Sequence, residues 1–241
     1  MNYRHFIQGW IYSTLPPEGF GAFLHDTGYA GSEKNFKLFV FSDLRGKYEI
    51  KNRQILFPGT VSLEIASVSE ELIQYLYQAL LKHPGVLLGN QNFEVLQVRM
   101  QSTQFFPGIK EVEIETISPV TAYRFEEGKF LYFAPGSVAF EEICKQNLVR
   151  KLEVLPAFQK DEICFSIKQI LSSRKQIVYF KNTFYEAYNT KMLIEVNFQT
   201  LDLLLNTGLS SKGSAGFGMV RLVEEHKHFS GKPALQVKPY E

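Results

Sequence analysis

Two periodicities of hydrophobic and polar residues alternate along the chain and predict a mixture of helices and strands. Apolar residues recur at helical spacing in three long segments, which we expect to be helices: 2–15, 70–83 and 137–155. Shorter helices are expected at 18–25 and just before residue 208. Strands are expected where apolar residues alternate with polar ones or form short runs: 36–41, 55–57, 61–65, 93–98, 112–117, 163–170, 176–184, 192–198 and a last one ending near 224.

The order of these elements divides the chain into two similar halves, with the segment around Pro107 and Gly108 as the best candidate for a boundary. Each half runs approximately strand–helix–strand–strand–helix–strand, which is the ferredoxin-like (RRM-like) pattern. The sequence therefore predicts an α+β fold with two tandem ferredoxin-like domains, over 1–106 and 107–224. A polar segment without periodicity follows, and we expect it to be a flexible tail over 225–241.

Composition agrees with a globular protein and narrows its chemistry. Hydrophobic residues make up 45% and aromatic residues 14% of the 241 residues, and the formal charge of +1 does not by itself point to nucleic acid. The two cysteines and five histidines show no metal-ligand spacing, so we expect no metal and no cofactor. No apolar run reaches the ~20 residues of a membrane helix, and the N-terminus lacks a signal-peptide pattern. We therefore expect a cytoplasmic protein without membrane contact.

The stretch 208–218 holds four glycines, three serines and a lysine, and it lies between a predicted helix and a predicted strand. A P-loop needs the opposite element order and a Lys-Ser or Lys-Thr pair after its second glycine, whereas Ser214 and Ala215 follow Gly213 here. A plain connector and a mononucleotide site stay open. We favour contact with a nucleic-acid backbone, because glycine lets amide groups approach phosphates closely. The expected phosphate-binding residues are Gly208, Lys212, Gly213, Ser214, Gly216 and Gly218.

A second candidate for phosphate contact is the segment from 163 to 185, which carries four basic residues and no acidic one. Lys168, Arg174 and Lys175 would extend the phosphate track of the glycine-rich stretch. The alternative is an ordinary solvated strand face, which is equally compatible with this charge pattern.

Several short segments, in order and at suitable spacing, resemble one known family over about residues 2–224. The segments are Gly9-Trp-Ile-Tyr12, Phe23-Leu-His25-Asp, Phe36 to Ser42, Ile117-Ser-Pro119-Val, Asn147-Leu148 through Lys151, Lys181-x-Thr-Phe184 and Gly213-x-x-Gly216-Phe-Gly218-Met-Val220. The chain resembles the CRISPR-associated endoribonucleases of the RAMP superfamily, which cut precursor CRISPR RNA within its repeats. The resemblance implies CRISPR repeat RNA as a partner. Other CRISPR effector subunits and a second copy of the chain stay open as further partners.

The resemblance also implies an active centre, because that family uses a tyrosine on the first helix, a following histidine and a lysine before the next strand. The matching residues are Tyr12, His25 and Lys37, and nearby Lys34 could replace Lys37. Histidine can exchange protons near neutral pH, and an ammonium group can neutralise charge on a phosphate in the transition state. The implied reaction is metal-independent cleavage by the 2′-OH, which gives a 2′,3′-cyclic phosphate and a 5′-OH.

Each of these assignments has an ordinary structural alternative. Tyr12 could be a core residue of an amphipathic helix, His25 a residue that satisfies a helix end, and Lys37 a solvent-facing strand residue. The alternative function is a non-catalytic RNA-binding subunit with the same fold, and a mononucleotide-binding regulatory protein is a third reading.

One feature departs from the family pattern. Family members begin with a strand before the first helix, and in a ferredoxin-like sheet that strand is central, whereas here the predicted helix starts next to Met1. Either the given start is too late or another segment replaces the strand. We therefore predict a gap, or a substituted strand, in the sheet of the first domain.

Overall fold

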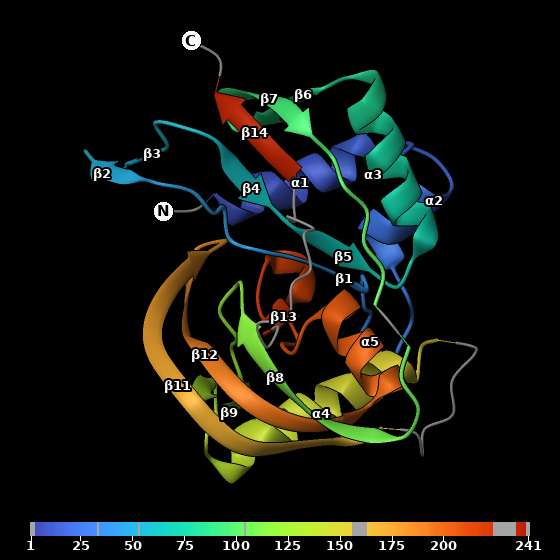
Figure 1. The fold of residues 1–241 in the computed structure, drawn as a ribbon, viewed down its shortest axis with the longest axis vertical. Helices are drawn as coiled ribbons and strands as arrows, with labels where there is room; N and C mark the ends of the chain where they lie inside the picture. Colours follow the sequence, from blue (N-terminus) through green and yellow to red (C-terminus); the bar gives the residue numbers. More distant parts are fainter. Residues whose placement is uncertain are drawn as a thin grey trace.

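The computed structural model describes residues 3–32, 34–52, 54–103, 105–155, 163–223 and 235–239. It shows an α+β fold in which two halves, each with helices packed against an antiparallel sheet, lie one above the other (Figure 1). The upper half in that view comes mainly from the first part of the chain, and the lower half from the second part.

The N-terminal half contains four helical segments among its described residues, three before its strands and one between them. Its elements are α1 (Arg4–Thr14), α2 (Phe20–Ala22), the π-helix η1 (Phe23–Thr27), β1 (Phe39–Phe41), β2 (Glu49–Lys51), β3 (Gln54–Leu56), β4 (Val61–Leu63), β5 (Ile65–Ser67), α3 (Glu70–Lys82), β6 (Gly85–Leu88) and β7 (Gln91–Gln97). Helix α1 buries Ile7, Trp10 and Ile11 on one face, as its helical periodicity predicts. Ser69 caps α3 by accepting a hydrogen bond from the backbone N–H of Leu72.

The sheet of this half contains a strand from the far end of the chain. Strand β14 (Leu235–Pro239) lies between β4 and β7 and pairs antiparallel with both, which gives the order β4-β14-β7-β6 (Figure 1). The predicted substituted strand is thus confirmed, and β14 supplies it. The expectation of a flexible tail over 225–241 is wrong for 235–239, because that segment pairs with two strands of the sheet. Residues 224–234 and 240–241 lie outside the described residues.

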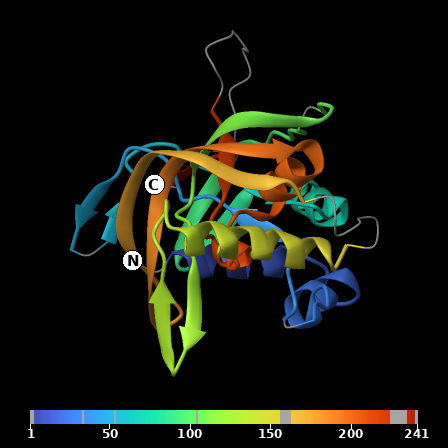
Figure 2. The same cartoon turned by 90° about the horizontal axis from the view of Figure 1, so that it is seen from below.

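The C-terminal half has the strand order β11-β12-β8-β13, all antiparallel, with helices α4 and α5 on one side (Figures 1 and 2). Its elements are β8 (Ile109–Thr116), β9 (Tyr123–Glu126), β10 (Lys129–Tyr132), α4 (Val138–Leu152), β11 (Phe165–Phe180), β12 (Thr183–Asn197), α5 (Phe198–Thr207), the 3-10 turn η3 (Gly213–Ala215) and β13 (Val220–Leu222). Strands β9 and β10 form a hairpin that projects away from the sheet (Figure 2).

Three strands expected between 163 and 198 are in fact two long ones. β11 continues through Ser172 and Ser173, where the polar residues suggested a break, and it absorbs them with two shifts of register against β12. The chain turns instead at Lys181 and Asn182, whose positive φ angles of 44° and 64° suit a tight hairpin.

Each half has its own hydrophobic core, and one of two smaller buried clusters lies between the two cores. The first core contains Ile7, Phe39 and Leu72, and the second contains Ile114, Phe140 and Leu204. Between them, Val40 of β1 packs with Ile117 and Met219. This small cluster places β1 of the first half directly against the loop that follows α5.

Candidate functional site

Tyr12 lies in the last turn of α1 with its side chain partly buried. Its ring packs edge-to-face against Phe39 of β1, with ring centroids 5.8 Å apart. Burial raises the pKa of Tyr12 to about 12. The phenol is therefore protonated at neutral pH and can donate a hydrogen bond to a ligand.

His25 lies on η1 and faces Tyr12. The two rings meet edge-to-face with centroids 5.0 Å apart and an interplanar angle of 84°. Nδ1 of His25 lies 2.6 Å from Oδ1 of Asp26, and because an ionised carboxylate can only accept, the Nδ1–H donates. In the neutral form of this ring, the lone pair is then on Nε2. The His25 side chain is 63% exposed, so solvent and ligands can reach it.

Lys37 reaches the same segment because the chain turns back after η1. Gly28 ends η1 with φ of +66°, and paired hydrogen bonds of 2.8 Å between Tyr29 and Phe36 return the chain alongside it. Nζ of Lys37 donates to the carbonyl oxygen of His25 at 2.7 Å. Burial lowers the pKa of Lys37, and the charge of Asp26 opposes this shift.

The structure therefore brings Tyr12, His25 and Lys37 together from three separate segments. Nζ of Lys34, the alternative lysine, lies 5.1 Å from the ring centroid of Phe36. The ammonium group of Lys37 contacts the histidine segment.

The glycine-rich stretch differs from the expected amide cradle. The N–H groups of Gly208, Gly216 and Gly218 already donate to the carbonyls of Leu204, Gly213 and Pro119, at 2.8, 2.8 and 2.9 Å. These glycines are buried against the rest of the protein. A Cβ on Gly216 would meet the ring of Phe41, and one on Gly213 would lie 2.9 Å from the carbonyl oxygen of Phe39. Gly213 and Gly216 let the loop pack on β1, and Gly208 and Gly218 let the two ends of the loop approach each other closely.

Lys212 and Ser214 are partly exposed residues of that loop. Nζ of Lys212 lies 4.9 Å from the ring centroid of Tyr185 and 5.8 Å from that of Tyr123. The carbonyl oxygen of Ser214 accepts a hydrogen bond from Nε2 of Gln8 at 2.6 Å. RNA contact through these two residues stays a prediction.

The predicted basic track along β11 is partly neutralised by the next strand. Lys168 pairs with Glu195 at 3.0 Å and Lys175 pairs with Glu186 at 2.6 Å, both across the β11–β12 ladder. Arg174 is exposed on the same strand. The acidic partners lie on β12, just beyond the segment in which the charges were counted, so that count missed them.

One face of α1 connects the glycine loop to the histidine cluster. Arg4, Gln8 and Tyr12 follow one another at intervals of four residues, which places them one above the other on a helix. Buried Arg4 donates to the carbonyl oxygen of Gly216 at 3.2 Å and forms an ion pair with Asp43. Sequence reasoning missed Arg4, Gln8 and Asp26, although the spacing of four was a usable signal for the first two.

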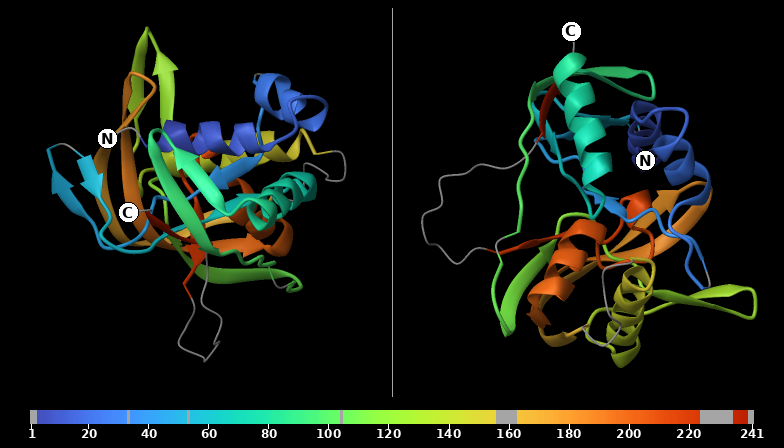
Figure 3. Two further views of the ribbon diagram at one scale, coloured as in Figure 1. Left: turned by 90° about the horizontal axis from the view of Figure 1, so that it is seen from above. Right: turned by 90° about the vertical axis from the view of Figure 1, so that its right-hand side faces the viewer.

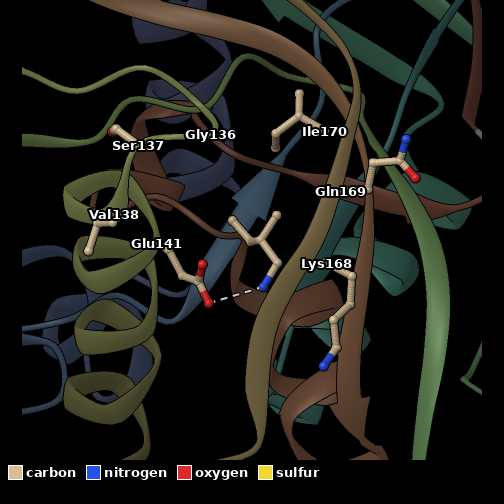
Figure 4. A pocket seen from close by; sticks show the side chains of 8 residues that line it. Gly136, Ser137, Val138, Glu141, Lys168, Gln169 and Ile170 are labelled. Carbon is tan, nitrogen blue, oxygen red and sulfur yellow. Dashed lines mark hydrogen bonds between the residues drawn. The ribbon is translucent and has the colours of Figure 1, made fainter.

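Other features of the described residues lie apart from this cluster. A hollow of about 260 Å³ lies between α4 and β11, where a Glu141 carboxylate oxygen accepts from the backbone N–H of Ile167 at 3.1 Å (Figure 4). Within the described residues, no three His, Cys, Asp or Glu side chains gather as a metal-binding group. None of the described helices has the length and apolar character to cross a membrane.

Comparison with known proteins places the chain with this α+β fold in a family. The family model for "CRISPR associated protein Cas6, C-terminal" matches residues 101–222, half of the chain, so the protein belongs to the Cas6 family of the RAMP superfamily. A "CRISPR-associated endoribonuclease Cas6 2" of Methanocaldococcus jannaschii is 25% identical, with 92% of each chain covered.

Two solved structures share the fold. One is described as "Characterization of a Cas6-related gene from Pyrococcus furiosus"; it has a TM-score of 0.76 and 21% identity, covering 94% of this chain and 92% of the other. The second, "An RAMP protein binding different RNA substrates", has a TM-score of 0.72 and 20% identity, with 92% of each chain covered.

Proposed function

We propose that the protein is a metal-independent endoribonuclease that processes CRISPR repeat RNA. The observation that carries this proposal is the meeting of Tyr12, His25 and Lys37 at an accessible surface, with ring centroids of Tyr12 and His25 5.0 Å apart and Lys37 2.7 Å from the His25 carbonyl. Family membership supports it, as does the endoribonuclease activity in the name of the M. jannaschii relative.

In this proposal the 2′-OH of one nucleotide attacks the adjacent phosphorus while the bond from phosphorus to the 5′ oxygen breaks. Nε2 of His25 takes the 2′ proton, and Asp26 orients the ring through Nδ1. The Lys37 ammonium group neutralises charge on the non-bridging oxygens and, because burial lowers its pKa, can supply the proton that the departing 5′ oxygen needs. Tyr12 donates a hydrogen bond to the phosphate. The products are a 2′,3′-cyclic phosphate and a 5′-OH.

We read each half as a ferredoxin-like domain, divided near residue 107. The strand order β11-β12-β8-β13 and the two intervening helices support this for the second half. In the first half, β14 takes the central position that the initial strand of a ferredoxin-like domain would hold. The first domain would then include a segment from beyond residue 224.

The RNA strand would run from the histidine cluster along α1 to the side chains of the glycine loop. The hydrogen bond from Gln8 to Ser214 supports this course, because it ties the loop to the helix one turn before Tyr12. We assign phosphate contact to Lys212 and Ser214, with Arg174 of β11 as a further candidate. The ion pairs of Lys168 and Lys175 make those two lysines weaker candidates.

The test is cleavage of the repeat RNA by the full chain in excess EDTA. We expect cleavage without added metal, a product that ends in a 2′,3′-cyclic phosphate, and no cleavage when the nucleotide before the cut carries 2′-deoxyribose. His25→Ala should slow cleavage by roughly 10²–10⁴-fold. His83→Ala, which removes another exposed histidine at the end of α3, is the matched control and should cleave normally.

Three results would contradict the proposal. Cleavage that requires Mg²⁺ would exclude the mechanism. Unchanged cleavage by His25→Ala would exclude His25 as the base. Wild-type protein that binds the repeat RNA without cleaving it would be a non-catalytic RNA-binding subunit.

A further inference from the structure

One face of the β9–β10 hairpin consists entirely of aromatic side chains. The pairing register places Phe125 opposite Phe130 and Tyr123 opposite Tyr132, and residues two apart on a strand share a face. These four rings therefore lie on the same side of the hairpin. Arg124 and Leu131 lie on the opposite side, and there Arg124 pairs with Glu142 of α4 at 3.2 Å.

The aromatic face is fixed at its base and exposed at its tip. Tyr123 and Tyr132 pack against the buried cluster of Tyr185 and Phe217, whose ring centroids are 5.6 Å apart. From this base the rings continue outward at spacings of 5.1 Å, from Tyr123 to Phe130, and 5.0 Å, from Phe130 to Phe125. The two outer side chains are exposed, Phe125 by 63% and Phe130 by 40%. An exposed aromatic face of this kind costs free energy in water unless a ligand covers it.

A positive charge lies beside this face. The Lys212 ammonium group sits 5.8 Å from the ring centroid of Tyr123 and 4.9 Å from that of Tyr185. Lys212 belongs to the loop that Gln8 holds against α1. In two opposite views, the hairpin and the α2–η1 segment that carries His25 project from the same side of the molecule, at opposite ends of α1 (Figures 2 and 3).

We infer that the aromatic face of the β9–β10 hairpin stacks unpaired bases of the RNA strand, with Lys212 contacting the phosphate next to them. Nucleic-acid bases have flat apolar faces, and the sugars that carry them are joined by phosphates. The adjacent rings of the hairpin can stack on such bases, and the nearby ammonium group can contact a phosphate. A purely apolar protein partner would offer no negatively charged group to the Lys212 ammonium group beside the rings. The inference rests on the proposed function, because it assumes an RNA strand that also reaches His25. It adds a second anchoring point, away from the cut site.

The test measures binding of the full chain to a labelled single-stranded RNA of the repeat sequence, with 2′-deoxyribose at the cut site so that it stays intact. The double change Phe125→Ala/Phe130→Ala removes only exposed rings and should raise Kd about tenfold or more. Leu131→Ala is the matched control, because Leu131 is 44% exposed on the opposite face of the same hairpin. Its Kd should equal that of the wild type.

A second measurement reports stacking directly. With 2-aminopurine placed in turn along the RNA, binding to the wild type should quench its fluorescence at one or more positions, and the double variant should lose that quenching. An equal Kd for wild type and double variant, or quenching that survives in the double variant, would overturn the inference.

These measurements can support or refute base stacking independently of whether the protein cleaves RNA. Wild-type protein that binds the deoxy-substituted RNA through the hairpin but leaves all-ribose RNA intact would refute the cleavage proposal and support stacking. Wild-type protein that cleaves, while the double variant binds as tightly, would support cleavage and refute stacking.

Discussion

At the scale of single residues, Lys151 is the most unusual group outside the proposed site. It lies at the end of α4, fully buried, and its ammonium group donates to the carbonyl oxygens of Thr207, at 3.0 Å, and Gly208. These two carbonyls lie at the C-terminal end of α5, where the glycine-rich stretch begins. Lys151 therefore supplies the hydrogen-bond donor that they lack within the helix. Burial, with a smaller effect from the charge of Lys34, lowers the pKa of Lys151 to about 7.

This lysine should make the stability of the protein depend on pH. The folded-state pKa is lower than the ordinary value of 10.5, so above pH 7 the unfolded chain binds one proton more than the folded chain. The contribution of Lys151 to the free energy of unfolding should therefore rise with pH from about 7, by up to ~1.4 kcal/mol per pH unit. Lys151→Met should lose this slope and, by leaving two carbonyls without a donor, be less stable by about 1–3 kcal/mol.

Urea unfolding of both proteins between pH 6 and 8.5 measures the difference. The upper limit keeps tyrosine ionisation out of the comparison. Parallel stability curves for the two proteins would show that Lys151 does not titrate in this range.

At the scale of elements, the contact between the glycine loop and β1 decides how the halves join. Gly216 has φ of +78°, and a Cβ there would lie 2.8 Å from Cζ of Phe41. Gly216→Ala should destabilise the protein by roughly 1–3 kcal/mol through overpacking, with about 1 kcal/mol more for the left-handed backbone. Thermal unfolding measures the loss.

Gly59→Ala is the control for this change, because a Cβ at Gly59 meets nothing within 4 Å. It should unfold at the wild-type temperature. If Gly216→Ala also did so, the tight packing of the loop on Phe41 would be refuted.

The long elements followed from local sequence, whereas the long-range contacts did not. Helices α3 and α4 begin after Ser69 and Ser137. The side chain of each serine accepts a hydrogen bond from a backbone N–H in the first turn of its helix. Tyr12, His25 and Lys37 were identified through the family resemblance, and periodicity alone would have left them as ordinary surface or core residues. The packing of Gly213 and Gly216 could not be predicted, because the residues they pack against, Phe39 and Phe41, lie in the other half of the chain. The aromatic face of the hairpin was visible as a spacing of two in Tyr123 and Phe125, and it was overlooked.

At the scale of the whole molecule, β14 makes the first sheet depend on the end of the chain. Removing residues 235–241 would separate β4 from β7 and leave both strands with an unpaired edge. We expect a lower unfolding temperature and faster amide exchange in β4 and β7, with little change in β8 and β12. Deletion of 240–241 alone is the control and should have no such effect. Unchanged exchange in β4 and β7 after the longer deletion would refute the pairing.

The position of β14 also fixes an order of events during synthesis. Domains generally fold as units while the ribosome is still extending the chain, and the N-terminal one usually folds first. Here the four strands of the second sheet are complete at Leu222, whereas the first sheet waits for Leu235–Pro239. The second half can therefore complete its sheet before the first, and the sheet beside α1 and α3 lacks an inner strand until β14 has been made.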